Sequence, residues 1–355
     1  MEKSLSELVI VEIASVLAGP SVGMFFAELG ARVIKIEPKH IGGDVTRTWK
    51  LPTEPKDTNI SAYFSSVNYG KEYHFLDFRN KEDFGKTINF IAEADIIITN
   101  FKHGDGVKFG LDYEAVKQHN SSIIYAAISG FGDDNDRVAY DLILQAETGF
   151  MSMNGTSDSG PVKMPVALID ILAGHQLKEG ILVALINRGR QGGTKVTVSL
   201  YEAAIASLAN QASNYLMTKH VAKRLGSLHP NIAPYGEIFE TRDQAKITFA
   251  IGSQKQFEKL LALLGLEFII ADPRYHTNAN RVLNRESLAK ILASQIILHN
   301  KFTILNYCLK HFVPAAEIKS IDQVFENKAA MDLVLSETIE GVETKRVKTI
   351  AFKIT

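Results

Sequence analysis

The sequence predicts an α/β protein with a Rossmann-like large domain, built on a parallel sheet, and a smaller α+β domain. Two observations carry this prediction. Apolar strand-like runs alternate with helical segments through the first half of the chain, beginning with a β-α-β unit at 7–36. The chain also has 355 residues, of which 46% are hydrophobic and 22% charged, enough for two ordinary globular domains.

The elements of the large domain follow from local patterns. In the first unit, a buried strand at 7–13 leads to a helix at 20–29 and a second strand at 32–36. Pro20 suits the first turn of this helix, where its missing N–H is no loss, and Gly30 suits its end. Further on we expect helices at 83–93, 113–118, 140–153, 171–187 and 200–222, and strands at 95–99, 122–128 and 195–199.

The pattern changes after Arg224. Two strand-like runs around the turn at 241–244 resemble a β-hairpin, and three helices are expected near 254–264, 285–298 and 301–312. We therefore predict a large domain at 1–200 completed by 326–355, a linker helix at 201–224 and a small α+β domain at 225–325.

Composition excludes several classes of protein. The formal net charge is −1 and the pI about 6.8, so nothing attracts the whole chain to nucleic acid or to an anionic membrane. No apolar run is long enough to cross a membrane, and the polar start lacks a secretory signal. Cys308 is the single cysteine, which excludes an intrachain disulfide and fits a cytoplasmic protein. No histidine has metal-ligand spacing around it, so no metal is expected.

The β-α-β unit does not carry a dinucleotide fingerprint. That fingerprint is Gly-x-Gly-x-x-Gly, whereas the turn here reads Ala18-Gly-Pro-Ser-Val-Gly23. Pro20 stands where a backbone N–H would be offered to phosphate. A nicotinamide cofactor is therefore disfavoured.

A different family is suggested by several motifs in order along the chain. They are 9–47, Asn100-Phe101 with Gly110-Leu-Asp-Tyr113, Ile128-Ser-Gly-Phe-Gly132 with Ala139-Tyr-Asp-Leu-Ile143, His229-Pro-Asn-Ile-Ala-Pro-Tyr235, and 272–281. Together they resemble the class III (CaiB/BaiF-like) CoA-transferases, the family of formyl-CoA transferase, carnitine CoA-transferase and α-methylacyl-CoA racemase. The resemblance spans about 9–325. It implies an interlocked homodimer that acts on an acyl-CoA and a carboxylic acid acceptor.

Asp170 falls on the nucleophilic aspartate of this family. The resemblance implies that it attacks the thioester to give an acyl-aspartyl anhydride, then forms an aspartyl-CoA thioester that the acceptor displaces. By position alone Asp170 is equally an N-cap of the following helix, where its carboxylate would stay ionised. The resemblance also suggests backbone donors for the oxyanions at Leu17 and Ala18. Leu17 stands where the oxalate-formate enzyme has a glutamine, so one side-chain donor is absent. The resemblance therefore disfavours formyl transfer.

Tyr140-Asp141 separates the transferase from the racemase. The racemase branch places a histidine before the aspartate, because it must move a proton at the carbon α to the thioester. Tyrosine has an ordinary pKa near 10 and is a poor base at neutral pH, so Tyr140 favours a transferase. Tyr140 is alternatively a packed aromatic residue, and Asp141 a helix-start residue.

The resemblance also implies a CoA site. The residues that it suggests are Val16, Lys39, Lys71, Asn100, Phe101, Lys102, Lys108, Ala139 and Asp141. Each lysine is alternatively an ordinary solvated charge. Lys102 replaces the family's arginine and cannot form a bidentate phosphate contact. Trp49 lies where some members place an aromatic residue of the substrate pocket.

Three hypotheses follow: a CoA-transferase, a racemase or isomerase of the same fold, and a catalytically silent CoA-binding dimer. Tyr140 discriminates between the first two. The altered CoA-site residues, and an end at Phe352-Lys-Ile-Thr355 without the family's Pro-x-Leu-Gly-Glu-His segment, keep the third open.

Overall fold

The computed structural model describes residues 5–353, without the side chains of 190 and 191, and it divides into two units. The large unit consists of the described residues of 1–152, 163–222 and 332–355. The small unit consists of 153–162 and 223–331. The chain thus leaves the large unit twice and returns to it twice.

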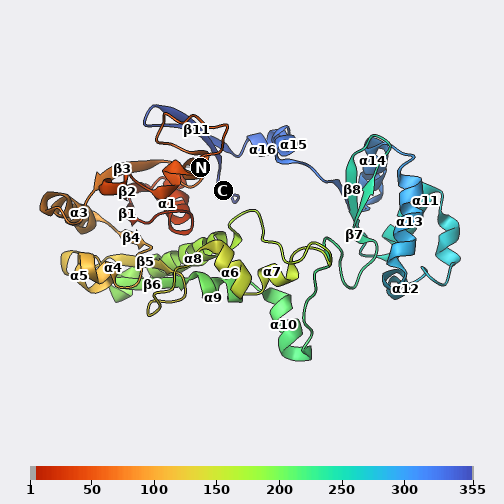
Figure 1. The fold of residues 1–355 in the computed structure, drawn as a ribbon, viewed down its shortest axis with the longest axis horizontal. Helices are drawn as coiled ribbons and strands as arrows, with labels where there is room; N and C mark the ends of the chain where they lie inside the picture. The colour runs from red at the N-terminus through yellow and green to blue at the C-terminus, as the bar shows by residue number, and fades with distance from the viewer. Residues whose placement is uncertain (1–4, 354–355) are drawn as a thin grey trace. The chain divides into compact units, whose positions relative to one another are not determined.

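A six-stranded parallel sheet forms the centre of the large unit (Figure 1). Its strands, in spatial order, are β3 (Lys71–Leu76), β2 (Arg32–Pro38), β1 (Val9–Ile13), β4 (Ile96–Thr99), β5 (Ile124–Ser129) and β6 (Thr194–Ser199). This is the strand order of a Rossmann fold, with a reversal between β1 and β4. The predicted fold class is confirmed. The sequence analysis missed β3, whose run of Lys, Glu, Tyr and His lacks the apolar character of the other strands.

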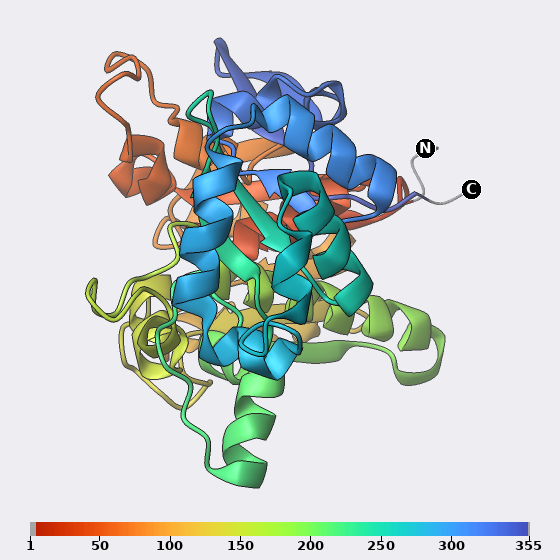
Figure 2. The same cartoon turned by 90° about the vertical axis from the view of Figure 1, so that its right-hand side faces the viewer.

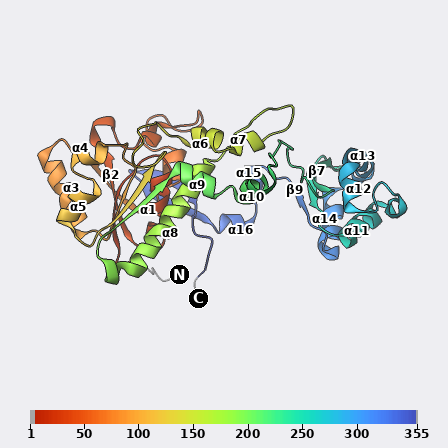
Figure 3. The same ribbon diagram turned by 90° about the horizontal axis from the view of Figure 1, so that it is seen from below.

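The two faces of the sheet are covered by different helices. Ile10 and Ile96 belong to the apolar cluster under α1 (Ala18–Glu28) and α8 (Leu168–Gln191), while their neighbours Val11 and Ile97 belong to the cluster under α3 (Lys81–Glu93) and α5 (Tyr113–His119). Figure 3 shows α8 along one side of the sheet and α3 and α5 on the other. Burial on both faces explains why most positions of the central strands are apolar, with Glu12 of β1 and Lys35 of β2 as exceptions.

The remaining elements of the large unit are short. They are η1 (Lys39–Ile41), η2 (Val45–Thr48), α2 (Ala62–Ser65), α4 (Asp105–Phe109), α6 (Asp141–Glu147), α7 (Phe150–Met153, which ends in the small unit), α9 (Leu200–Ala206), α10 (Ala209–Thr218) and the hairpin of β10 (Val334–Ile339) and β11 (Val342–Val347). The single helix predicted at 200–222 is wrong: α9 ends at Ala206, and α10 begins at Ala209, whose positive φ of 47° interrupts the helical path. None of the described helices has the length and apolar character needed to cross a membrane.

The small unit packs helices against an antiparallel sheet (Figure 2). Its sheet has the order β7 (Tyr235–Glu240), β8 (Lys246–Ala250) and β9 (Ala315–Glu317). Its helices are α11 (Gln254–Leu264), η3 (Glu267–Ala271), α12 (Asn278–Leu283), α13 (Arg285–Ile296), α14 (Lys301–His311), α15 (Ile321–Phe325) and α16 (Lys328–Met331). The predicted hairpin and three helices agree with β7, β8, α11, α13 and α14.

Charged side chains are buried beneath the first β-α turn of the large unit. Glu12 lies between Lys35 and Lys71, with Oε1 at 2.9 Å and 3.0 Å from their Nζ atoms. Glu12 Oε2 is 2.7 Å from Lys71 Nζ, as an ion pair without hydrogen-bond alignment. All three side chains are inaccessible to solvent. Gly23 of α1 allows this approach, since a Cβ there would lie 1.8 Å from Glu12 Oε2.

A second buried ion pair lies close by. Arg47 donates to both carboxylate oxygens of Glu37, at 2.6 Å and 2.7 Å, and its guanidinium lies 4.1 Å from the ring centre of Phe64. Both charged side chains are at most 1% exposed. Arg47 Nη1 also lies 3.1 Å from Oε1 of Glu340, whose side chain is 38% exposed, so loss of Glu37 would leave the buried guanidinium with this partly solvated partner.

We therefore expect Glu37→Ala to lower the free energy of unfolding of the large unit by about 3–5 kcal/mol. Urea denaturation followed by the fluorescence of Trp49, the single tryptophan, would measure it. The control is Glu72→Ala, which removes an Arg32 pair whose side chains are 45% and 47% exposed. That loss should stay below about 1 kcal/mol. Equal losses would contradict the role assigned to burial.

Candidate active site

A cavity of about 800 Å³ opens beside the carboxyl ends of the parallel strands. It is lined by 15–18 after β1, by 99–104 around the end of β4, and by 127–130 around the end of β5. The strand order reverses between β1 and β4, and the crevice at such a reversal is where open α/β sheets bind ligands. The fold itself therefore marks this cavity as the candidate site.

The turn between β1 and α1 forms one wall of the cavity. Val16 has a φ of 72°, in the left-handed region that β-branched residues rarely adopt. Leu17 is the N-cap of α1 and Ala18 its first residue. Neither N–H donates a hydrogen bond to another residue that the structure describes. These two amides are free donors at the helix end that attracts negative charge.

Asp170 lines the cavity from the first turn of α8. It is the third residue of the helix, and Ala167 is the N-cap, so the N-cap alternative for Asp170 is wrong. The residue is 7% exposed, and its carboxylate accepts no hydrogen bond from any described residue. Burial, and then the negative charge of Asp141, raise the pKa of Asp170 to about 7. Burial thus opposes the ionised form that the sequence analysis expects at the helix start.

Asp141 holds α6 against the start of α8. Its Oδ1 accepts from the N–H of Ile169 at 2.7 Å, and its Oδ2 accepts from Gln145 Nε2 at 2.6 Å. Both oxygens are thus engaged, and Asp141 is not among the residues that line the cavity. Asp141 acts on Asp170 through position and charge.

Comparison with known families matches residues 5–355 to the family described as CoA-transferase family III. This chain belongs to CoA-transferase family III. It is 39% identical over 328 residues to the succinate–glutarate CoA-transferase of Agrobacterium fabrum, covering 90% of this chain and 81% of that one. It is 31% identical to the succinyl-CoA:mesaconate CoA-transferase of Haloarcula hispanica, covering 91% and 82%. A CaiB/BaiF family protein from Brucella suis has a similar structure, with a TM-score of 0.88 and 36% identity over 99% of this chain and 92% of the other.

In this family III chain, Tyr140 and Ala139 also line the cavity. Tyr140 is the N-cap of α6 and is 56% exposed, so the alternative of a packed aromatic residue is wrong. Its hydroxyl makes no hydrogen bond with another described residue. Tyr140 thus presents a free phenol to the same space as Asp170.

Basic residues gather on the cavity wall. Lys102 and Lys108 are exposed, and neither forms an ion pair with a described residue. Two further cations were missed by the sequence analysis. Lys195 lies 2.7 Å from Asp133, and Arg137 lies 3.9 Å from the ring centre of Phe131 and pairs with Glu147. No motif marked them, since only the fold brings 137 and 195 to this wall.

Asn100 and Phe101 line the cavity as well, with different surroundings. The Asn100 amide is engaged with the backbone of Ser15: its Oδ1 accepts from the N–H at 3.1 Å and its Nδ2 donates to the carbonyl at 2.8 Å. Asn100 therefore holds the turn after β1. Phe101 packs towards Phe109, with ring centres 6.4 Å apart.

Besides Asp141, two predicted CoA ligands lie outside the cavity lining. Lys71 is corrected: its Nζ donates to Glu12, to the Pro20 carbonyl and to Asn68, so no donor remains for a phosphate. Lys39 is 64% exposed, with its Nζ 3.9 Å from Asp83. The basic character of both was visible in the sequence, but the burial of Lys71 was not.

An aromatic pair stands near Asp170 and Asp141. Trp49 packs edge-on against Tyr63, with ring centres 5.1 Å apart. Burial, followed by the charges of Asp170 and Asp141, raises the pKa of Tyr63 to about 12. Tyr63 was missed because no motif residue flanks it.

The remaining candidate groups are the single cysteine and possible metal ligands. Cys308 is buried in the small unit, and burial raises the pKa of its thiol to about 11, so it stays protonated. Among the described residues, no group of three histidine, cysteine or acidic side chains could hold a metal ion.

The raised pKa of Asp170 makes a prediction about stability. Burial penalises the ionised form, so the protonated form stabilises the fold, fully below about pH 4 and progressively less up to about pH 7. We expect Asp170→Asn to match wild type at acidic pH and to exceed its stability above pH 7 by about 2–4 kcal/mol. Denaturation midpoints at several pH values would measure this. The exposed Asp134→Asn is the control, and a difference independent of pH would contradict the assignment.

Proposed function

We propose that this family III enzyme transfers CoA from a dicarboxylic acyl-CoA, such as succinyl-CoA, to a dicarboxylic acid, with Asp170 as the nucleophile. The observation that carries this is the carboxylate itself: it is buried, lines the cavity and accepts no hydrogen bond from a described residue. A carboxylate stripped of partners is a stronger nucleophile than one that is solvated. The substrate class is supported by the names of the two relatives, both of which act on dicarboxylic acids.

The proposed reaction has four exchanges that balance without a net proton. An Asp170 oxygen bonds to the thioester carbonyl carbon, and the carbon–sulfur bond breaks. This gives an acyl-aspartyl anhydride and releases CoA as the thiolate. The thiolate then bonds to the Asp170 carbonyl carbon and releases the donor acid. The acceptor carboxylate attacks this aspartyl-CoA thioester and expels the thiolate. The thiolate finally attacks the acceptor carbonyl, giving the new acyl-CoA and free Asp170.

Each exchange develops a negative charge on a carbonyl oxygen. The free amides of Leu17 and Ala18 are the donors that we assign to it, because they lie at the start of α1 on the same cavity. Backbone donors fixed in a turn need no rearrangement as the charge forms. The turn at Val16 therefore sets the geometry of the reaction.

We assign the CoA phosphates to the basic wall. Lys102 and Lys108 supply unpaired ammonium groups, and Lys195 and Arg137 supply cations already oriented by acidic partners. Val16, Phe101 and Ala139 offer apolar contacts on the same cavity. Tyr140 disfavours the racemase, since that reaction needs a base that ionises near neutral pH.

The direct test is to trap the aspartyl intermediate. Wild type incubated with succinyl-CoA and hydroxylamine should carry a hydroxamate at Asp170, formed from the aspartyl-CoA thioester and located by mass spectrometry of peptides. Asp170→Asn should carry none and should lose at least about a thousandfold in kcat. The exposed Asp134→Asn, outside the cavity lining, should behave as wild type. The rate of acylation should rise with pH through about 7, as Asp170 ionises.

Trapping has two informative failures. If no acyl-CoA modifies wild type although CoA binds, the chain is a silent CoA-binding protein. If a hydrogen isotope from the solvent is instead incorporated at the carbon α to the thioester, the racemase hypothesis replaces the transferase hypothesis.

We further propose a homodimer, as the family resemblance implies. Apolar side chains are exposed along α8, including Val183 at 58% and Ile186 at 81%, and Met217 of α10 is 83% exposed. Exposed apolar residues in this number favour association. Sedimentation should show a dimer, and Ile186→Asp should shift it towards monomer. A wild-type monomer at micromolar concentration would exclude this proposal.

A further inference from the structure

Val16 occupies a conformation that its own chemistry disfavours. With a φ of 72°, its branched side chain is crowded against its backbone, and such residues persist only where the surroundings impose them. Val16 immediately precedes Leu17 and Ala18, whose amides we assign to the oxyanions. A relaxed Val16 would therefore redirect both donors.

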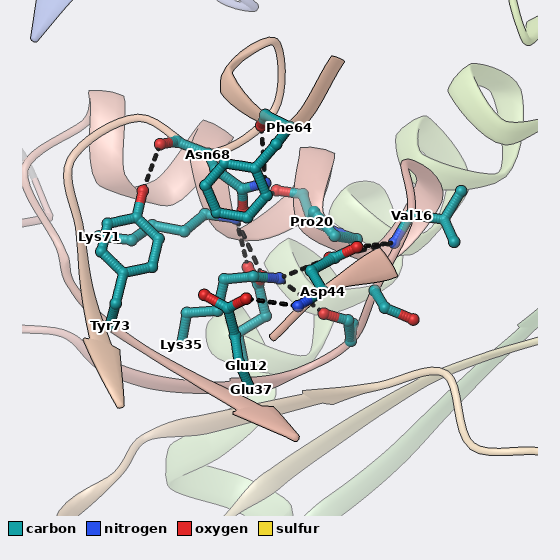
Figure 4. A network of polar contacts seen from close by, with 12 residues as sticks. Glu12, Val16, Pro20, Lys35, Glu37, Asp44, Phe64, Asn68, Lys71 and Tyr73 are labelled. Carbon is teal, nitrogen blue, oxygen red and sulfur yellow. Dashed lines mark hydrogen bonds and ion pairs between the residues drawn. The ribbon is translucent and has the colours of Figure 1, made fainter. Parts of the chain in front are cut away.

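Three side chains impose this conformation by forming hydrogen bonds with the backbone of three consecutive residues. Lys35 Nζ donates to the Ala14 carbonyl at 2.7 Å, and Asn100 bonds both the N–H and the carbonyl of Ser15. The third contact is on Val16 itself, whose N–H points to the Asp44 carboxylate, at 3.2 Å from Oδ2 and 3.4 Å from Oδ1. Asp44 is thus the side chain that holds the strained residue (Figure 4).

Asp44 is itself fixed by buried groups. Its Oδ1 accepts from the N–H and the hydroxyl of Thr46, at 3.0 Å and 2.8 Å, and its Oδ2 lies 3.2 Å from Lys35 Nζ. Its own N–H donates to Glu37 at 2.6 Å. Figure 4 shows Lys35 between Glu12 and Asp44, so one buried ammonium links β1, β2 and the loop before η2.

The charges behind the turn are balanced. Lys35 and Lys71 carry two positive charges, and Glu12 and Asp44 carry two negative ones. Burial alone would lower the pKa of Lys35, but Glu12, Asp44 and Glu37 raise it above its ordinary value, so Lys35 stays charged. Buried ion pairs add little net stability compared with apolar packing. Their value here lies in the fixed geometry of Asp44.

We propose that Asp44 is a positioning residue: by holding the N–H of Val16 in the left-handed conformation, it aims the Leu17 and Ala18 amides at the acyl oxygen. It contacts no reacting atom, and Lys35 fixes its carboxylate. This inference rests on the proposed function, because the oxyanions arise from attack by Asp170.

The test is the single-turnover rate of Asp170 acylation by succinyl-CoA, measured beside the dissociation constant of CoA. Asp44→Ala should slow acylation about 100-fold, since small misplacements of catalytic groups cost this much. CoA binding should change by less than about threefold, because the basic wall is untouched. Asp44→Asn keeps an oxygen for the Val16 N–H and should lose only about tenfold.

A second mutant background, Val16→Gly, distinguishes a positioning role of Asp44 from a role in supporting the loop alone. Glycine adopts a positive φ without strain, so in Val16→Gly the turn depends less on Asp44. Asp44→Ala should then slow acylation by about tenfold or less relative to Val16→Gly alone. Equal losses in the two backgrounds, or an Asp44→Ala enzyme within about threefold of wild type, would overturn the proposal.

The matched control is Asp95→Ala. Asp95 also accepts a backbone N–H of β1, that of Val9 at 2.8 Å, and pairs with Arg188 at 2.5 Å, but it does so at the opposite end of the strand. Its loss should lower thermal stability and leave the acylation rate within about threefold of wild type. If Asp44→Ala does not fold, the Asn variant and the Val16→Gly pair carry the test.

A crystal structure of the Asp44 variant separates this inference from the proposed function. A negative φ at Val16 is expected, and a retained positive φ would overturn the inference whatever the reaction is. An absence of any adduct at Asp170 in wild type would instead sink the proposed function and leave the role of Asp44 in the turn intact.

Discussion

Four charges sealed beneath the turn after β1 must serve as one another's partners, because the side chains of Glu12, Lys35, Asp44 and Lys71 are at most 1% exposed. An unpaired member would carry an uncompensated charge in a medium of low dielectric constant. The requirement fixes the register of β1, β2 and β3, which contribute three of them, and the course of the loop that brings Asp44 back. The carboxyl edge of the sheet is thereby rigid where the chemistry needs it.

Asp170 is the opposite case, a carboxylate buried without compensation. Glu12 and Asp44 are satisfied by lysines and backbone donors, whereas Asp170 receives no hydrogen bond from a described residue and feels the charge of Asp141. The first two are held still by their partners, and the third is left reactive by the lack of them. The buried Asp170 carboxylate thus lowers the stability of the fold, and the surrounding network of paired charges confines this effect to one site.

The same logic divides the basic residues. Lys35 and Lys71 lie inside and act on backbone and carboxylates, while Lys102 and Lys108 lie on the cavity wall and have no acidic partner within residues 5–353. Only the second kind can exchange water for a phosphate. In the proposed reaction, the fixed turn would serve the acyl group and the accessible cations would serve the CoA phosphates.

The sequence by itself determined the alternation of strands and helices and the family, because apolar periodicity and short motifs are local properties. It also singled out Asp170, whose role stays a prediction. It missed β3, the break between α9 and α10, and the start of α8 at Leu168, because their signals are weak without their neighbours. Only the tertiary structure decided that Lys71 is an interior partner of Glu12 and that Arg137 and Lys195 face the cavity. Burial and charge pairing depend on residues far apart in the chain, which no local pattern records.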